Sequence, residues 1–167
     1  MTLSDDDSDY TAYAAGALPW LRRFAYLLCQ DWHRADDLVQ TTATQLYVHW
    51  GRASRIENLD AYTRRILVNV YLAEQRTSWW KRVTPHRDPG ERPAAETDLD
   101  AAMDVRRALA ALPPRQRAAV VLRYYGGLSV DETAAALGCT STNVRSQTSR
   151  GLARLRAGLE ESQVNIG

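Results

Sequence analysis

The amino-acid sequence predicts an all-α protein of two small helical domains joined by a flexible linker, the second domain containing a helix-turn-helix. Three observations predict this fold class. Apolar residues recur every three or four positions along most of the chain, as in amphipathic helices. No stretch alternates apolar and polar residues in the way that a strand would. Residues 83–98 lack periodicity and contain three prolines and a glycine, so they predict a linker between domains at 10–82 and 99–160.

The first domain is predicted to begin with two helices. The first starts near Tyr10, because the residues before it are too acidic and polar to be expected to fold. The second starts near Ala35 and is ended by Gly51. Asp36 and Asp37 then fall in its first turn, where the helix dipole favours acidic groups.

A third helix is predicted to start near Asn58. Its apolar side comprises Leu59, Tyr62, Ile66, Val70 and Ala73. Its opposite side presents arginines and an asparagine, and Trp79 and Trp80 follow. Aromatic and basic residues in one segment are typical of surfaces that bind unpaired DNA, because bases stack on rings while cations bind phosphates. An amphipathic helix with solvated arginines explains the same residues, so this helix alone does not decide between the two interpretations.

Two further helices are predicted before the helix-turn-helix. The helical pattern resumes at Leu99 and stops at Pro113 and Pro114. These prolines can begin the next helix. The inward side of that next helix comprises Ala118, Val121, Leu122 and Tyr125. Gly126 and Gly127 are expected to end it.

Residues 128–156 predict the helix-turn-helix itself. Ser129 and Glu132 have the spacing of a capping box, and Gly138 suits a left-handed turn residue. Thr140 or Ser141 can cap the second helix. Small residues at Ala134 and Ala135 are expected to leave room for that helix, whose buried stripe includes Val144.

A polar stripe follows the second helix of this motif. It comprises Asn143, Gln147, Arg150 and Arg154. Amides can bind base edges, and guanidinium groups can bind guanine or phosphate. The stripe therefore favours DNA binding over an ordinary helical hairpin with a solvated side.

Composition and charge exclude several classes of protein. No apolar run is long enough to span a membrane, and the acidic start is unlike a signal peptide, so a cytoplasmic protein is expected. The net charge is only +1, but residues 51–90 carry eight basic and four acidic side chains, and residues 113–167 carry seven and four. Two basic segments suit a protein that touches nucleic acid at two places.

No cofactor or metal is predicted. The histidines are scattered, and although His33 and Asp37 are four residues apart and could ligate a metal on a helix, no other ligands accompany them. Cys29 and Cys139 have no ligand cluster near them and are expected to be core residues or free thiols.

Three segments together resemble a known family. Residues 35–40, ADDLVQ, are followed by AYTRRILVNVYLAEQR at 61–76 and by LPPRQRAAVVLRYYGGLSVDETAAALGCTSTNVRSQTSRGLARLR at 112–156. Over roughly 18–155, the chain resembles the two-domain extracytoplasmic-function (ECF, group 4) sigma factors of bacterial RNA polymerase. The ending SQTSRGLARLR resembles the SigE-like actinobacterial subgroup.

The resemblance implies a function and a set of site residues. An alternative sigma factor binds core RNA polymerase and directs initiation at promoters with particular −35 and −10 elements, helping to melt the DNA. By position, the implied contacts with the polymerase clamp helices are Asp36, Asp37, Leu38, Val39 and Gln40. The implied contacts with the −10 region, which follow a loop at 51–58, are Arg65, Asn69 and Arg76. The implied contacts with the −35 major groove are Ser141, Thr142, Asn143, Arg145, Ser146, Gln147 and Arg150.

The resemblance also bears on partners. Small sigma factors are often held inactive by an anti-sigma factor, and the residues neither require nor exclude one here. At Tyr62, Thr63 and Arg64 the chain departs from many relatives, so packing at the polar Thr63 is not predicted.

Three other functions were weighed against this one. An enzyme is disfavoured by the lack of a catalytic or ligand cluster. A helix-turn-helix repressor or response-regulator-like protein explains 112–156 but leaves ADDLVQ and the third helix unexplained. An adaptor that binds polymerase without DNA would need no polar stripe at 143–154.

Overall fold

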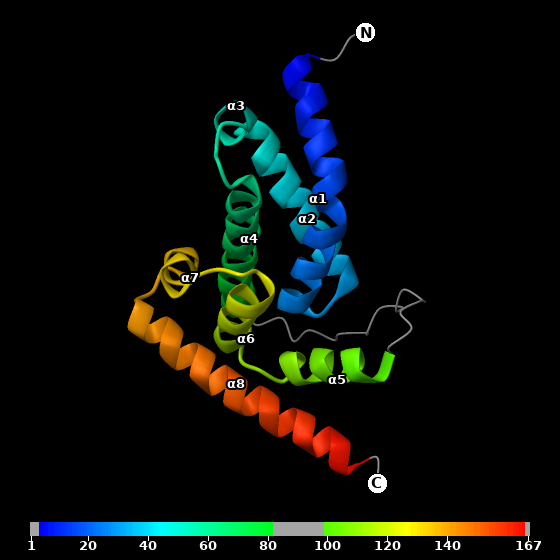
Figure 1. The fold of residues 1–167 in the computed structure, drawn as a ribbon, viewed down its shortest axis with the longest axis vertical. Helices are drawn as coiled ribbons and strands as arrows, with labels where there is room; N and C mark the ends of the chain where they lie inside the picture. Colours follow the sequence, from blue (N-terminus) through cyan, green and yellow to red (C-terminus); the bar gives the residue numbers. More distant parts are fainter. Residues whose placement is uncertain (1–3, 82–98, 166–167) are drawn as a thin grey trace. The chain divides into compact units, whose positions relative to one another are not determined.

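The chain divides into two compact units, residues 1–87 and 88–167. The computed structural model describes residues 4–81 and 99–165, and every regular element within them is helical (Figure 1). The predicted all-α class with two helical domains is therefore confirmed. The predicted linker, 83–98, lies outside the described residues. The limits predicted for the two domains stay predictions.

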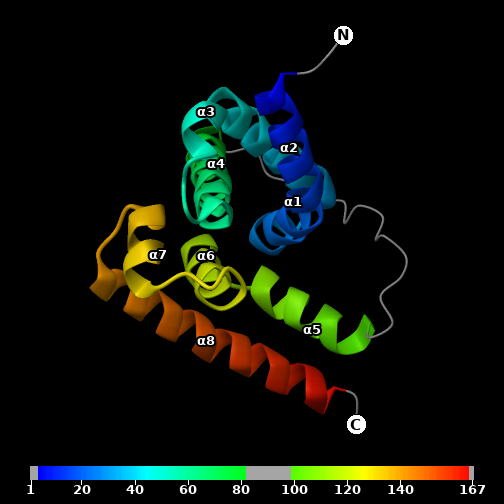
Figure 2. The same ribbon diagram turned by 45° about the horizontal axis from the view of Figure 1, so that its top comes forward.

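The first unit is a bundle of three long helices. Helices α1 (Asp5–Cys29), α2 (Trp32–Val48) and α4 (Leu59–Lys81) pack against one another, and the short α3 (Trp50–Ala53) leads from α2 towards α4 (Figures 1 and 2). Gly51 therefore lies inside α3 and does not end α2 as predicted. Helix α2 ends at Val48, and Trp50 is buried at the start of α3.

Helix α1 begins five residues earlier than the sequence predicted. The Ser4 hydroxyl accepts a hydrogen bond from the Asp7 amide at 3.3 Å, and three aspartates occupy the first turn. Their charges face the positive end of the helix dipole. The prediction that the residues before Tyr10 would not fold was therefore wrong from Asp5 onward, because the acidic composition suits a helix start.

Helix α2 also begins early. The Asp31 carboxylate accepts hydrogen bonds from the amides of His33 and Arg34, at 2.8 and 3.2 Å, so the helix starts at Trp32 and not near Ala35. Asp36 and Asp37 consequently lie beyond the first turn, which contains no acidic residue. The helix dipole acts mainly within the first turn, so it does not account for these two carboxylates.

A polar residue takes part in the core of this first unit. The largest fully buried side chains there include Tyr71, Phe24, Leu28, Leu38, Leu46 and Leu67. Thr63 is buried among them, and its hydroxyl donates to the Leu59 carbonyl at 2.9 Å. The Thr63 and Tyr13 hydroxyl oxygens lie 2.9 Å apart, and Tyr13 also donates to Asp60 at 2.8 Å. These bonds satisfy the hydroxyl of Thr63 and join α1 to the start of α4.

The second unit is built along its last helix. Helices α5 (Leu99–Ala110), α6 (Pro114–Val120) and α7 (Val130–Leu137) each pack against α8 (Ser141–Val164) (Figures 1 and 2). A π-helical turn, η1 (Val121–Tyr125), follows α6 directly. The prolines open α6 as predicted.

The π-helical turn changes which side chains point inward. The Gly126 amide donates to the Val121 carbonyl at 2.9 Å, which spans one residue more than an α-helical bond. The extra residue shifts the register of the turn. Val121 and Leu122 are buried as predicted, but Tyr125 is 48% exposed, so its predicted inward position was wrong.

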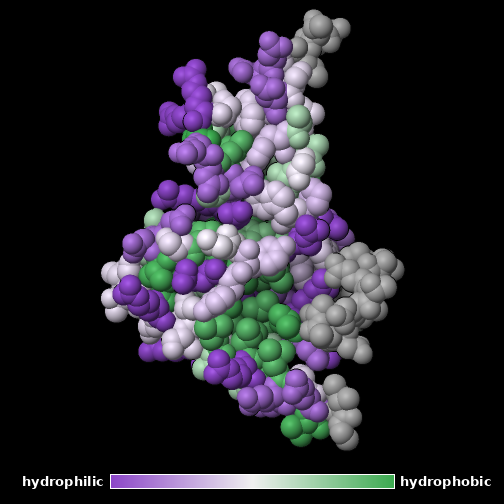
Figure 3. Space-filling model, viewed as in Figure 1, coloured by the Kyte–Doolittle hydropathy of each residue, from purple (hydrophilic) through white to green (hydrophobic). Residues whose placement is uncertain are grey.

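The predicted apolar stripe of α8 is only partly covered. Val144 is fully buried, while Leu152, Leu155 and Leu159 are half-buried. Figure 3 shows apolar surface gathered over α5 and α8. Val105 of α5 is among the exposed apolar residues of this unit.

Candidate nucleic-acid interface

The first helix of the helix-turn-helix is fixed by reciprocal capping. The Ser129 hydroxyl accepts from the Glu132 amide at 3.0 Å, and the Glu132 carboxylate accepts from the Ser129 amide at 3.0 Å. This is the predicted capping box. Helix α7 therefore starts at a defined residue, which sets the position of the turn that follows.

The turn between α7 and α8 also forms as predicted. Gly138 has a left-handed backbone with φ of 65°, and the Cys139 amide donates to the Ala134 carbonyl at 3.0 Å. The sequence left Thr140 and Ser141 as alternative caps of α8. The structure assigns Thr140, whose hydroxyl accepts from the Asn143 amide at 3.1 Å.

The two helices cross at small and branched side chains. Ala134 and Val144 are both buried, as was predicted for a small residue of α7 and for the buried stripe of α8. Ala135 was also expected to lie at the crossing, but it is exposed and does not take part. The crossing leaves the opposite side of α8 open to solvent.

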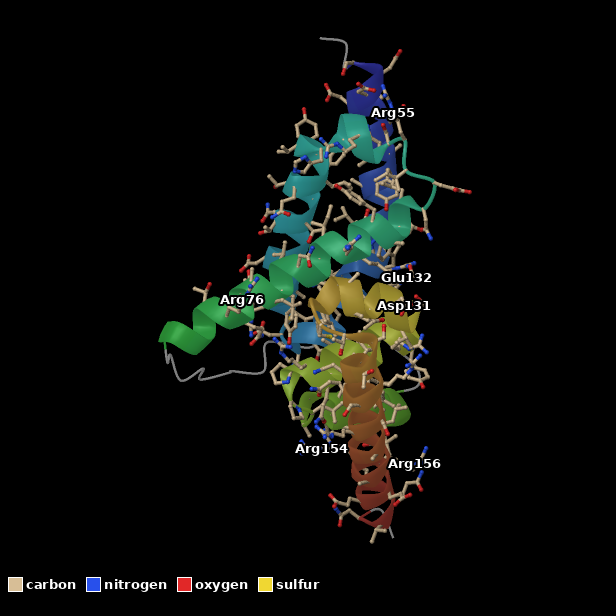
Figure 4. All side chains as sticks on the ribbon, turned by 90° about the vertical axis from the view of Figure 1, so that its left-hand side faces the viewer. Arg55, Arg76, Asp131, Glu132, Arg154 and Arg156 are labelled. Carbon is tan, nitrogen blue, oxygen red and sulfur yellow. The ribbon has the colours of Figure 1, made fainter. Side chains whose placement is uncertain are left out.

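The predicted −35 contacts differ in exposure. Thr142, Asn143, Arg145 and Arg150 are exposed, and Ser146 and Gln147 are half-buried. Ser141 is half-buried, and its hydroxyl donates to the Asp131 carboxylate of α7 at 2.7 Å. Farther along α8, Arg154 and Arg156 project from opposite sides of the helix (Figure 4). The exposed side of α8 thus carries amide, hydroxyl and guanidinium groups that can bind a duplex.

Two contacts that the sequence did not predict fix the packing of the second unit, one between α6 and α8 and one between the end of α5 and α6. A Cβ atom at Gly151 would lie 2.7 Å from Val120 Cγ2 and 3.2 Å from the Gln116 carbonyl oxygen, so α6 and α8 approach closely only because this residue is glycine. Arg117 is buried, and its guanidinium donates to the carbonyls of Leu109, Ala110 and Leu112 at 2.9, 3.2 and 3.0 Å. No local pattern distinguishes Arg117 from Arg115, which directly follows the double proline and is exposed.

In the first unit, the predicted −10 contacts share the exposed side of α4. Arg65, Asn69 and Arg76 are all exposed, while Ile66, Leu67, Val68 and Val70 between them are buried. Arg76 lies towards the C-terminal end of α4 (Figure 4). Trp79 and Trp80 continue the helix, but their side chains lie outside the described residues.

The connection before α4 adds positive charge that the predicted site did not include. Arg52 and Arg55 are exposed, and Figure 4 shows Arg55 at the bend that leads into α4. The Asn58 side chain accepts from the Ala61 amide at 3.1 Å and so caps α4, whose predicted start is confirmed.

The predicted polymerase contacts on α2 are only partly accessible. Leu38 and Val39 are 0% and 6% exposed and belong to the core, so their prediction as contact residues is corrected. Asp36 is exposed, and its carboxylate accepts from the Arg22 guanidinium at 2.7 Å. Asp37 and Gln40 are exposed and line a shallow hollow together with neighbouring polar residues of α2.

An aromatic stack supports the ion pair between Asp36 and Arg22. The guanidinium carbon of Arg22 lies 4.5 Å from the centre of the Trp32 ring, and the rings of Tyr26 and Trp32 stack with centres 4.1 Å apart. Arg22 is therefore held by a ring and by a carboxylate at once. Part of the negative charge of Asp36 is neutralised within the unit, whereas Asp37 has no ion pair among the described residues.

Ionisable groups near this surface are perturbed by burial. Burial raises the pKa of Glu74 on α4, the charge of Asp37 raises it further, and Arg34 lowers it. Burial also raises the pKa of the Cys29 thiol to about 11. Cys29 is buried, as expected of a core residue, and Cys139 is partly exposed at the turn.

The described residues contain no group of three His, Cys, Asp or Glu side chains that could hold a metal ion. None of the described helices is both long and apolar enough to cross a membrane.

Comparison with known proteins accounts for both units. The sigma-70 region 2 family matches residues 15–81, and the sigma-70 region 4 family matches residues 102–155. A repressor or response-regulator-like protein would account for the second match only, so the first match disfavours that alternative.

Individual relatives agree with these family matches. The chain is 37% identical to the RNA polymerase sigma-E factor of Streptomyces avermitilis, over 87% of this chain and 82% of that protein. It is 39% identical to the sigma-E factor of Streptomyces coelicolor, over 81% and 77%. Its fold resembles that of the sigma factor RpoE solved in complex with the anti-sigma factor NepR from Bartonella quintana, with a TM-score of 0.77 and 29% identity over 91% of this chain and 97% of that one.

The two sigma-70 regions occur in the expected order, and each folds as its own helical unit. The relatives are matched over most of their length. These findings lead to one conclusion. The chain belongs to the sigma-70 family of bacterial RNA polymerase sigma factors, in the extracytoplasmic-function class and close to the sigma-E factors of Streptomyces.

Proposed function

We propose that this sigma factor assigns a separate task to each exposed helix surface described above. Helix α2 docks on core RNA polymerase, α4 with the preceding basic connection binds the melted −10 strand, and α8 binds the −35 duplex. This proposal rests on the exposure of the polar sides of α4 and α8. Both are long helices, and the opposite side of each packs in the core of its own unit. An exposed polar side on each unit provides two separate DNA contacts.

The docking surface on α2 consists of Asp37 and Gln40, with Asp36 in a supporting position. Asp37 has no ion pair among the described residues, so its charge is available to a basic surface. An acidic, polar helix surface is complementary to a basic coiled coil. Binding to polymerase also places the protein in the cytoplasm, where transcription occurs.

The first unit aids melting by binding one form of DNA more strongly than another. The Asn69 amide can hydrogen-bond the edge of an unpaired base, and Arg65 and Arg76 can bind the adjoining phosphates. These contacts form only when the base has left the stack, so they shift the equilibrium towards open DNA. The sigma factor supplies no covalent chemistry, because catalysis belongs to the polymerase.

The second unit fixes the position of the complex on the promoter. The first three turns of α8 enter the major groove, and Asn143, Gln147 and Arg150 contact base edges or phosphates there. The net charge is only +1 over residues 1–87 and zero over residues 88–167, so tight binding to DNA requires both units to engage at once. An anti-sigma factor is a further proposed partner, supported by the similar fold of a sigma factor solved with one.

Run-off transcription with purified bacterial core RNA polymerase tests the proposed function. We expect promoter-dependent transcripts with this chain and none without it. A repressor would give no such transcripts. Asn69→Ala and the double change Gln147→Ala with Arg150→Ala are expected to reduce transcript yield about 5- to 100-fold, while Arg107→Ala, an exposed arginine on α5, should not. Unchanged initiation by the double variant would instead support an adaptor that does not contact DNA.

The docking surface makes a second, separable prediction. Asp37→Asn is expected to weaken binding to core polymerase about three- to tenfold at low salt, with a smaller loss at high salt. Asp36→Asn serves as the matched neighbour and should have the smaller effect, because Arg22 already neutralises that carboxylate. Affinity measured by fluorescence anisotropy of labelled protein distinguishes the two. A larger effect at Asp36 would contradict the assignment.

A further inference from the structure

A hydrogen bond joins the two helices of the helix-turn-helix at the end that enters the groove. The Ser141 hydroxyl, on the first residue of α8, donates to the Asp131 carboxylate at 2.7 Å. Figure 4 shows Asp131 and Glu132 on α7, which packs against α8. The Glu132 carboxylate caps its own helix through Ser129, so Asp131 is the acidic group of this turn that reaches the recognition helix.

This bond determines what the serine can offer to DNA. A serine hydroxyl has one proton and two lone pairs, and an ionised carboxylate only accepts. Since the proton of Ser141 is directed to Asp131, the Ser141 oxygen presents lone pairs alone to any third group. It can accept a hydrogen bond from DNA but cannot donate one while the bond to Asp131 persists.

Phosphate oxygens and the N7 and O6 atoms of guanine accept hydrogen bonds, so they are poor partners for Ser141 in this state. The nearby carboxylate also repels phosphates. The donors in the major groove are the exocyclic amino groups of adenine and cytosine. Residues at the start of a recognition helix are those that contact base edges, and Ser141 opens α8.

We propose that Asp131 and Ser141 together select a base with an exocyclic amino group, adenine or cytosine, at one position of the −35 element. Asp131 is thus a specificity-determining residue that acts in part through Ser141. The inference rests on the proposed binding of the −35 duplex by α8. It gives Ser141 the role of an acceptor that discriminates between bases.

The test uses polymerase holoenzyme formed with the full chain and promoters in which each −35 base pair is changed in turn. Run-off transcription is measured for each promoter. At one position, we expect A·T and C·G to exceed T·A and G·C about three- to tenfold, because reversing a pair moves the amino group across the groove. Ser141→Ala and Asp131→Ala should each reduce this preference towards onefold and leave preferences at the other positions unchanged, because each change removes one partner of the hydrogen bond.

Three controls make the result decisive. Ser162→Ala, on the same helix, removes a hydroxyl that bonds the Gly158 carbonyl and should leave every preference unchanged. Ser141→Thr keeps a hydroxyl and should keep the preference. Replacing the preferred adenine or cytosine by an analogue without the amino group should lower wild-type transcription but not that of Ser141→Ala.

Two outcomes would overturn the inference. An unchanged preference in both Ser141→Ala and Asp131→Ala would remove the pair from recognition. A uniform loss across all promoters would show that Ser141 binds phosphate. Failure of the proposed function itself is distinct, because wild-type holoenzyme would then give no promoter-dependent transcripts at all.

Discussion

Glu74 shows how one side chain links the core of the first unit to its proposed docking surface. It is a partly buried carboxyl on α4, influenced by Arg34 and Asp37 of α2. Burial disfavours its ionised form, and the negative charge of Asp37 does the same. Its pKa is therefore raised in the folded protein above the ordinary value of 4.5.

The sign of the resulting pH dependence follows from this shift. A carboxyl with a raised pKa in the folded state contributes stability below pH 4.5, and that contribution is lost as the pH rises through the folded-state pKa. Glu74→Gln removes the ionised form, so the midpoint of thermal unfolding of the first unit should rise at pH 7 by about 1–4 °C. The gain should vanish near pH 4.

Thermal unfolding followed by circular dichroism at the two pH values measures this difference. Glu57→Gln is the matched control, because Glu57 is an exposed glutamate in the connection before α4. An equal gain from Glu74→Gln at both pH values would show that ionisation of Glu74 is not the cause.

At the level of elements, the second unit depends on the close crossing of α6 and α8. Gly151 is the point of closest approach, and Val120 and Gln116 occupy the space that a larger residue would need. The buried guanidinium of Arg117 donates hydrogen bonds to carbonyls at the end of α5, which fixes that end against α6. The position of the recognition helix therefore rests on residues that do not themselves face DNA.

Gly151→Ala tests this crossing. The added Cβ would contact Val120 Cγ2 at 2.7 Å, so one helix must shift. We expect the second unit to lose about 1–3 kcal/mol of unfolding free energy, partly offset by the better helix propensity of alanine. Gly158→Ala, on the same helix with its nearest atom at 3.5 Å, should be neutral or stabilise by up to about 1 kcal/mol. Urea denaturation measures both, and equal effects of the two changes would contradict the argument.

At the level of the whole molecule, the two units have separate cores. Large buried side chains of the first unit come from α1, α2 and α4, and those of the second from α5 to α8. Two compact units joined by a proline-containing segment are expected to unfold independently.

Differential scanning calorimetry of the full chain should therefore show two transitions. Gly151→Ala should lower the midpoint of one by about 4 °C or more and leave the other unchanged, whereas Glu74→Gln at pH 7 should move only the other. A single transition that both substitutions shift together would show that the units unfold as one.

The sequence predicted the parts of this fold that depend on local patterns. The Ser129 capping box, the left-handed Gly138 and the proline start of α6 depend on residues close in sequence, and all three are confirmed. Two errors in helix boundaries arose from caps that were not anticipated, and the error at Tyr125 arose from the π-helical turn. Asp31 moved the start of α2, and Ser4 moved the start of α1.

The sites were predicted less completely than the fold. Family position identified α2 as a docking helix, but only packing shows that Leu38 and Val39 lie inside while Asp37 lies outside. The bond between Asp131 and Ser141 joins residues ten positions apart, across the turn. No spacing rule predicts it, because it depends on the crossing angle of two helices.

The burial of Arg117 has a mechanical consequence. Its guanidinium is permanently charged and donates hydrogen bonds to carbonyls at the carboxyl end of α5 and to Leu112. If α5 unravelled from that end, the charge would be left in the core without its hydrogen-bond partners. A pulling force applied where the chain enters α5 would therefore be transmitted through these bonds to α6.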